Sequence, residues 1–283
     1  MNPTLKHVNH ENINNNKILH SYKLHNGNRR GVNKNNLIKI STKSSNGGGK
    51  WITFGLLNSR SVRNKSVVLN DFVVDKKLDF LALTETWLTV NDESDITESL
   101  TPEGFTFTHT PRNSKNPGGG VGLLIKSQFK TKPIKSTTFK SFELLEIILK
   151  LEDKSIRICN IYRPPPSQKN GFTFNGFIDE FSEYLADLST LHESVLIVGD
   201  FNIHIEDKSN ADTAKYLDLL ATFNFTQIVN KNTHIKGHCI DHVIIRQNDI
   251  IIQQPVIHDP GISDHFAVIS KIFSQKPQSM AFP

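Results

Sequence analysis

A carboxylate and a carboxamide stand two residues apart in Gly199-Asp200-Phe201-Asn202, directly after the apolar run 195–198. The run predicts a buried strand. Because side chains alternate along a strand, Asp200 and Asn202 should leave its end on the same side. Together they could hold a water molecule and a phosphate oxygen, or a hard cation. We therefore expect the chemistry of this chain to lie at this strand end.

Other polar residues stand where predicted strands begin or end. Strand ends that share a sheet gather in space, so these residues are candidates for the same site. They are Asn58 after the strand 52–57, Glu85 after 78–83, Tyr162 at the end of 155–162, Asp241 in 240–245, and Asp264 with His265 at the start of 265–273.

The elements that would position these residues follow from hydrophobic periodicity. Further strands are predicted at 143–150, 195–199 and 250–256, and helices at 65–76, 174–188 and 211–223. Many strands with few helices between them predict an α/β fold. We expect two mixed β-sheets packed face to face and flanked by helices, a four-layer α/β sandwich.

The composition indicates a globular protein, with 37% hydrophobic and 22% charged residues among 283. The two cysteines, Cys159 and Cys239, have no C-x-x-C spacing, which favours a reducing compartment over a disulfide scaffold. No apolar signal segment opens the chain and no stretch has the length of a membrane span. We expect a nuclear or cytoplasmic protein that is not secreted and has no membrane partner.

The net charge of +5 is unevenly distributed. Residues 1–50 hold nine of the 33 lysines and arginines but one of the 28 acidic residues, together with twelve asparagines. This composition predicts a disordered basic leader, either a spacer or an arm that binds polyanions. We expect a folded domain over 51–275 and a C-terminal tail over 276–283.

With these residues in this order, the sequence resembles the endonuclease/exonuclease/phosphatase superfamily, which includes deoxyribonuclease I. Finer details resemble the endonuclease domain of LINE-type (non-LTR) retrotransposons. They are Leu57-Asn58-Ser59-Arg60, Leu83-Thr84-Glu85-Thr86-Trp87, Tyr162-Arg163-Pro164-Pro165, Gly199-Asp200-Phe201-Asn202-Ile203-His204 and Ile262-Ser263-Asp264-His265. The chain stops at Pro283, about where a reverse transcriptase would begin, so a fragment, a truncated copy and a solitary domain all remain possible.

The resemblance implies a deoxyribonuclease I-like fold and a Mg²⁺-dependent endonuclease, with Mn²⁺ as an alternative ion. Its partner would be DNA, with a reverse transcriptase and element RNA supplied elsewhere. Glu85 would be the main metal ligand, with Asn58 and Asp264 nearby. Asp200, oriented by Asn202, would activate water.

The remaining expected roles concern the phosphate. His265, kept cationic by Asp264, would donate to a phosphate oxygen, and Tyr162 would add a hydrogen bond. Asp241 would support the site from behind. Among the arginines of the loops, Arg60, Arg63, Arg112 and Arg163, we expect Arg60 and Arg163 to contact DNA phosphates, alongside Asn202 and His265.

Two alternatives stay open: a phosphatase or phosphodiesterase of the same fold that acts on a lipid or small phosphate ester, and a catalytically silent relic. Two motifs suggest other sites but do not support them. No helix start follows Gly118-Gly119-Gly120, which favours a hairpin entry over a phosphate cradle. His234, His238 and His242 recur every four residues, but the strand-like context of 240–243 would not put them on one face, so we expect no zinc there.

Overall fold

The computed structural model describes residues 50–89, 94–112, 118–135, 137–152, 154–167, 170–247 and 249–274, all in the unit of the chain that begins at Gly47. The expected leader and C-terminal tail lie outside the described residues.

The strands and helices alternate along the chain in the following order. They are β1 (Trp51–Asn58), α1 (Ser66–Asp75), β2 (Phe80–Thr84), α2 (Ser94–Leu100), β3 (Phe105–Thr110), β4 (Val121–Lys126), β5 (Lys130–Pro133), β6 (Glu143–Lys150), β7 (Ser155–Tyr162), α3 (Phe174–Ser189), β8 (Ser194–Asp200), α4 (Ala211–Thr222), β9 (Phe225–Gln227), β10 (Asp241–Arg246), β11 (Val256–His258) and β12 (Ala267–Phe273).

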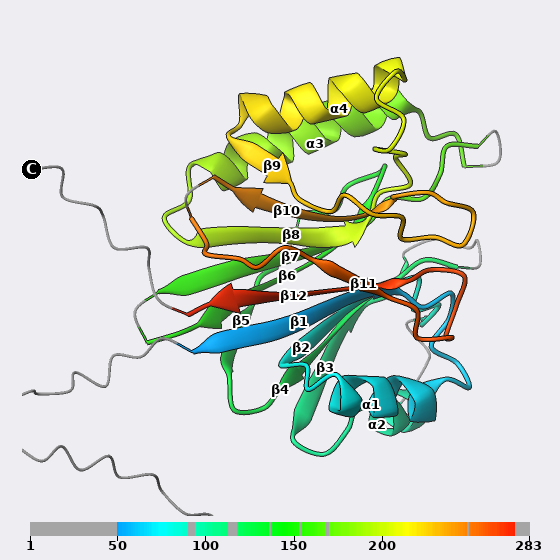
Figure 1. Ribbon diagram of the computed structural model, residues 1–283, viewed down its shortest axis with the longest axis vertical. Helices are drawn as coiled ribbons and strands as arrows, with labels where there is room; N and C mark the ends of the chain where they lie inside the picture. Colours follow the sequence, from blue (N-terminus) through cyan, green and yellow to red (C-terminus); the bar gives the residue numbers. More distant parts are fainter. Residues whose placement is uncertain are drawn as a thin grey trace, which may run out of the picture. The chain divides into compact units, whose positions relative to one another are not determined.

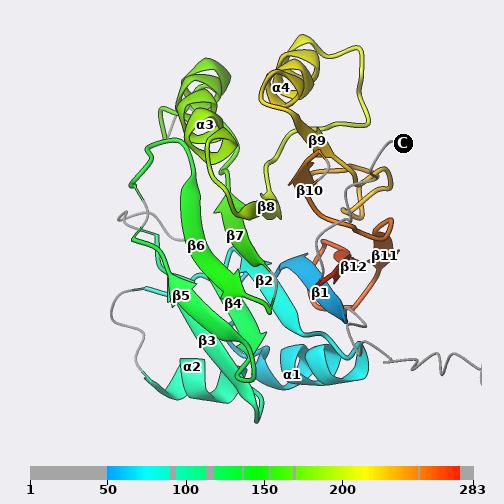
Figure 2. The same ribbon diagram turned by 90° about the vertical axis from the view of Figure 1, so that its left-hand side faces the viewer.

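Two six-stranded sheets pack face to face, and helices cover their outer faces (Figure 1). The first sheet has the order β11-β12-β1-β2-β4-β3, and the second has the order β5-β6-β7-β8-β10-β9. Figure 2 shows α1 and α2 beside the first sheet and α3 and α4 beside the second. Both sheets mix parallel and antiparallel pairs, so the predicted four-layer sandwich is confirmed.

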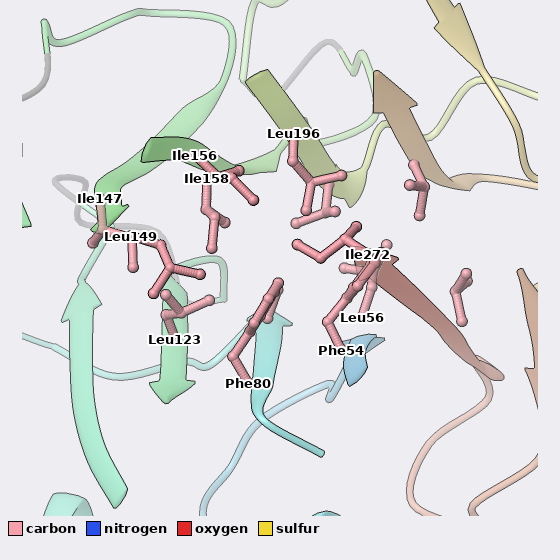
Figure 3. Packing of buried hydrophobic residues seen from close by; sticks show 14 of the residues in the cluster. Phe54, Leu56, Phe80, Leu123, Ile147, Leu149, Ile156, Ile158, Leu196 and Ile272 are labelled. Carbon is pink, nitrogen blue, oxygen red and sulfur yellow. The ribbon is translucent and has the colours of Figure 1, made fainter. Parts of the chain in front are cut away.

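The main core fills the space between the sheets (Figure 3). Phe54 and Phe80 from neighbouring strands of the first sheet stack with their ring centroids 5.2 Å apart. Ile158 and Leu196 approach from the second sheet, and all four are fully or almost fully buried. Burial of this area removes the two inner faces from water and fixes how the sheets dock.

The strand register gathers the candidate residues at one edge of each sheet. In the first sheet, β1 and β2 are parallel, and Asn58 lies opposite Thr84, directly before Glu85. In the second sheet, Tyr162 and Asp241 both lie opposite Asp200, one from each neighbouring strand. The expectation that strand ends share an edge therefore holds.

The predicted strand 250–256 is wrong in its extent. Ile252 forms an isolated bridge to Ile272, and β11 then begins at Val256. Pro255 lies between them and has no N–H to donate, which interrupts pairing at that point. The sequence analysis also did not predict α2, β3, β5 and β9, which are at most seven residues long.

The first and last strands of the described fold are neighbours. β1 and β12 are antiparallel, with Trp51 opposite Phe273. Beyond them, Lys50 N–H donates to Ser274 Oγ at 2.7 Å and Ser274 N–H donates to Lys50 O at 3.0 Å. The two ends of the described chain therefore lie side by side, at the opposite end of β1 from Asn58. None of the described helices has the length and apolar character needed to cross a membrane.

Gly199 permits the close pairing of β7 and β8 directly before Asp200. A Cβ at this position would overlap the backbone carbonyl of Ile161 on the neighbouring strand, and φ is 154°. We expect Gly199→Ala to lower the free energy of unfolding by about 3 kcal/mol or more, because backbone must move to admit the methyl group. Urea denaturation followed by circular dichroism measures this.

The control is Gly104→Ala, where φ is 80° but no atom lies within 4 Å of the added Cβ. Only the strain of the left-handed backbone remains there, about 1–2 kcal/mol. Equal destabilisation by the two variants would contradict the close-packing argument.

Candidate active site

Asn58 connects the two sheets at the site. It is fully buried at the end of β1, and its Nδ2 donates to Glu85 Oε1 at 3.0 Å and to Asp200 Oδ2 at 2.8 Å. Its Oδ1 accepts from the Arg60 N–H at 3.0 Å. One amide nitrogen thus holds two carboxylates close together, Glu85 from the first sheet and Asp200 from the second.

Glu85 is oriented from both sides of its carboxylate. Its Oε2 accepts from Trp87 Nε1 at 3.0 Å while Oε1 contacts Asn58. Tyr162 lies at the end of β7, nearly buried, and the guanidinium of Arg112 lies 5.5 Å from its ring centroid. Burial, followed by the charges of Glu85 and Asp200, raises the pKa of Tyr162 far above its usual value. The phenol therefore stays protonated and can act as a hydrogen-bond donor.

Asp200 is buried, and backbone and side-chain donors fix both of its oxygens. Oδ1 accepts from Asn202 N–H at 2.9 Å, and Oδ2 accepts from Asn58. The Asn202 side chain has a separate role, because its Nδ2 donates to Arg163 O at 2.9 Å. The expectation that Asn202 orients Asp200 holds for the backbone of Asn202.

His265 is held by Asp241. Asp241 Oδ2 lies 2.8 Å from His265 Nδ1, and both side chains are buried. The expectation that Asp264 holds the imidazole is wrong, because Nδ1 of the ring faces Asp241, although the ligand atoms of Asp264 and His265 lie within 4.8 Å of each other. Asp264 Oδ2 instead contacts Arg60 Nη1 at 2.6 Å and His234 Nε2 at 3.3 Å.

Three ionisable groups, Asp200, Asp241 and His265, share this buried region, and their ligand atoms lie within 4.8 Å of one another. Burial and then the charge of Asp241 raise the pKa of Asp200 well above its usual range, while His265 opposes the rise. Burial lowers the pKa of His265, but the charge and hydrogen bond of Asp241 outweigh it and raise this pKa to about 9. His265 is therefore a cation at neutral pH, which offsets the burial of two carboxylates.

The two arginines expected to bind phosphate have different surroundings. The side chain of Arg60 is 53% exposed and lies beside Asp264, so it remains a candidate for a surface contact. Arg163 is buried, and its Nη1 donates to Phe201 O at 2.9 Å and to Asn202 O at 3.3 Å. Arg163 therefore fixes the segment after β8 from inside, and its expected contact with substrate stays a prediction.

Several site residues have left-handed backbone conformations that are uncommon outside glycine. The φ angles are 41° for Arg60, 51° for Glu85, 56° for Trp87 and 50° for Asn202. Such conformations persist where surrounding contacts enforce them, and they concentrate at functional sites.

The donor set suits a hard cation in part. Glu85 offers carboxylate oxygens at the edge, and Asp264 Oδ1 is buried without a hydrogen-bond partner among the described residues. Oxygen ligands of this kind are those that Mg²⁺ and Mn²⁺ prefer. Asn58 departs from the expected ligand role, since it presents nitrogen to Glu85 and would need its amide turned over to offer oxygen.

Sequence reasoning missed several residues that support the site. Ser263 Oγ donates to Asn58 O at 2.6 Å and ties the segment before β12 to the end of β1. Trp87 belongs to a quoted motif, but only its left-handed backbone brings the indole to Glu85. Arg112, considered for phosphate, instead pairs with Glu143, which also accepts from the Gly120 N–H.

The three histidines at four-residue spacing have separate partners. His234 contacts Asp264, His238 Nδ1 lies 2.9 Å from Glu206 Oε1, and His242 Nδ1 lies 3.0 Å from the Tyr216 hydroxyl. His242 is fully buried, and burial lowers its pKa to about 4, so it is neutral. The spacing thus does not bring these three imidazoles together.

Comparison with known proteins relates the chain to others with this fold. It is 22% identical over 151 residues to the RNA-directed DNA polymerase from mobile element jockey of Drosophila melanogaster, a match covering 53% of this chain and 15% of that protein. The structure superposes on AP endonuclease LMAP from Leishmania major with a TM-score of 0.66 and 14% identity, covering 80% of this chain and 89% of that one.

A second solved structure with the same fold is the endonuclease domain of TRAS1, a telomere-specific non-LTR retrotransposon. Its TM-score is 0.64 at 10% identity, and the match covers 80% of this chain and 100% of that domain. These likenesses establish the fold. The sequence of residues 46–265 matches the Endonuclease/Exonuclease/phosphatase family, whose enzymes hydrolyse phosphodiesters or phosphate esters, generally with a divalent metal. The chain therefore belongs to the endonuclease/exonuclease/phosphatase family.

Proposed function

We propose that this chain is a Mg²⁺-dependent DNA endonuclease, of the kind found in LINE-type retrotransposons, that leaves a 3′-hydroxyl and a 5′-phosphate. The observation that carries the proposal is the buried group of Asp200, Asp241 and His265 beside Glu85. It combines a base, a cation and a metal-ligating carboxylate at one edge. The likeness to the jockey polymerase and to the TRAS1 endonuclease domain supports DNA as the substrate.

Asp200 is the proposed general base. The Asn202 N–H and Asn58 Nδ2 fix its two oxygens, so the carboxylate can hold one water molecule in a constant orientation. Burial and the charge of Asp241 raise its pKa to about 8, so this carboxylate accepts a proton more readily than an ordinary aspartate does. The base would take one proton from water as the oxygen attacks phosphorus.

His265 and Tyr162 are the proposed donors to the phosphate. Because Nδ1 of the His265 imidazolium is directed to Asp241, its Nε2–H remains to donate to a non-bridging oxygen. Tyr162 keeps its proton because burial raises the pKa of its hydroxyl. These two groups would meet the negative charge that grows on the phosphate in the transition state.

Glu85, with an oxygen of Asp264, would hold the divalent ion. When bound, Mg²⁺ or Mn²⁺ supplies positive charge to the scissile phosphate and the departing 3′-oxygen. Trp87 and Asn58 fix the Glu85 carboxylate before any ion arrives. Arg60, exposed and oriented by Asp264, would bind a flanking phosphate of the DNA backbone.

An extended substrate is proposed over a small phosphate ester because the likeness to two retrotransposon proteins points to DNA. A DNA strand would lie across the edge where the strands end. A nuclear or cytoplasmic location, and a reverse transcriptase with its RNA as partners, complete the proposal.

Substitution of the proposed catalytic groups tests the reaction. We expect His265→Ala and Asp200→Asn each to slow nicking of supercoiled plasmid by roughly 10²–10⁴-fold, because each removes one proton-transfer or charge-stabilising group. Nicking by the full-length wild-type chain should require Mg²⁺ and stop with EDTA. Gel electrophoresis of open-circular product measures the rate.

His192→Ala is the matched control, since His192 is exposed and precedes β8, at the opposite end of that strand from Asp200. It should nick at the wild-type rate. Near-normal nicking by His265→Ala would contradict the assigned role. No nicking by well-folded wild-type protein, together with hydrolysis of an inositol phosphate, would replace the endonuclease by a small-ester phosphatase.

The Asp241–His265 pair predicts a pH profile. Because the pKa of His265 is raised to about 9, its cation persists below that pH and nicking should fall above it. Asp241→Asn removes the charge that raises the pKa of both His265 and Asp200. Both limbs of the pH–rate profile should therefore move to lower pH, the alkaline limb by about 1–3 units.

Asp264→Asn provides the comparison, because Asp264 contacts Arg60 and His234 and has no hydrogen bond to His265. The alkaline limb of the pH–rate profile should move less in Asp264→Asn than in Asp241→Asn. An NMR titration of His265 in the metal-free proteins follows the same pKa without activity. An unchanged His265 titration in Asp241→Asn would refute the pairing.

A further inference from the structure

A second cluster of metal-ligating side chains lies outside the proposed catalytic site. His204 Nδ1 and His238 Nδ1 face the same carboxylate oxygen, Glu206 Oε1, at 3.3 Å and 2.9 Å. The ligand atoms of the three residues all lie within 4.8 Å of one another, and the two imidazole centroids are 4.0 Å apart. We propose that His204, Glu206 and His238 form a binding site for zinc or a similar transition metal.

The spacing of the ligand atoms matches what such an ion requires. Zinc binds imidazole nitrogen and carboxylate oxygen at about 2.0–2.2 Å in a tetrahedron, which places neighbouring ligand atoms about 3.3 Å apart. The two measured separations lie close to that value. Three protein ligands leave the fourth position for water. The ion needs only small adjustments of side chains that already face one another.

The surrounding chain holds Glu206 in place for this role. Its second oxygen, Oε2, accepts from the Cys239 N–H at 2.9 Å, a hydrogen bond that fixes the carboxylate while Oε1 faces the imidazoles. Hydrogen bonds of this kind to ligand side chains strengthen metal sites. The backbone around it is also tied down, because Asp207 N–H donates to His204 O at 3.1 Å.

The site is open to solvent, so an ion can enter. The side chains of His204, His238 and Glu206 are 49%, 35% and 31% exposed. Two imidazoles with one carboxylate favour zinc, cobalt or nickel over Mg²⁺, which prefers oxygen ligands and keeps its waters. This ion would therefore differ from the one proposed at Glu85.

The bound ion would join two segments that carry catalytic residues. His204 and Glu206 belong to the segment 201–210 after β8, directly following Asp200 and Asn202. His238 belongs to the segment 228–240, which leads into β10 at Asp241. Both segments lie where β8 ends and β10 begins (Figure 1). A metal here would cross-link the two segments and so hold the carboxylates of Asp200 and Asp241 in their relative positions.

Cobalt and zinc titrations of the metal-free, tag-free full-length chain test the proposal. With excess Mg²⁺ present to fill the oxygen-rich site, we expect one equivalent of Co²⁺ to give the intense visible absorption of tetrahedral coordination, and one equivalent of Zn²⁺ to remove it. Glu206→Gln and His238→Ala should each weaken binding at least roughly tenfold, since even the loss of a supporting hydrogen bond has an effect of that size.

Three variants separate this site from other metal-binding groups. His192→Ala removes an exposed histidine elsewhere, and Glu85→Gln alters the proposed Mg²⁺ site, so both should keep the cobalt spectrum. The histidines at positions 7, 10, 20 and 25 are present in every protein and cancel in the comparison. His204→Ala, at the most exposed of the three ligands, replaces any variant that circular dichroism finds unfolded.

Thermal unfolding gives an independent readout. Zinc should raise Tm of the wild type and of Glu85→Gln, because an ion bound only to the folded chain stabilises it, and should leave Tm of Glu206→Gln unchanged. Wild-type cobalt spectra and affinity in folded Glu206→Gln and His238→Ala would overturn the proposal. So would loss of the spectrum in Glu85→Gln alone, which would assign the ion to the catalytic edge.

Discussion

The structure of the site depends on the burial of two carboxylates directly opposite each other. Asp200 and Asp241 end and begin neighbouring strands of the second sheet, and neither is accessible enough for water to screen their repulsion. His265, which precedes β12 of the first sheet, supplies the compensating cation. This cation and the raised pKa of Asp200 both lower the cost of burying the two carboxyl groups side by side. The charge balance of the site therefore depends on how the two sheets dock.

Two buried asparagine side chains also form hydrogen bonds between the two sheets. Asn58 joins a carboxylate from each sheet, and Asn160 Nδ2 reaches from β7 to the carbonyls of Leu83 and Gly122 in the first sheet, both at 2.9 Å. These amides are buried in an otherwise apolar interface, where a polar group without a partner is costly. They favour one alignment of the sheets over others that would bury the same hydrophobic area.

Much of this arrangement could be predicted from the sequence, because apolar runs that end in polar residues locate both the strands and the site. The hydrogen-bond partner of His265 could not be predicted in this way. Asp264 is its neighbour in sequence, but the true partner, Asp241, is set by the register of β8 and β10 and by the docking of β12. The burial of Arg163 could not be predicted for a similar reason, since its internal acceptors and the ring of Phe177, 4.8 Å away, come from elsewhere in the chain.

The pairing of the first and last strands has a consequence for whatever adjoins this fold. Because Trp51 and Phe273 lie side by side, segments attached before and after the described residues depart from one corner. That corner is seven residues along β1 from Asn58, roughly 23 Å at the rise of an extended strand. A module fused at either end would thus be attached at the opposite end of β1 from Asn58 and the candidate site.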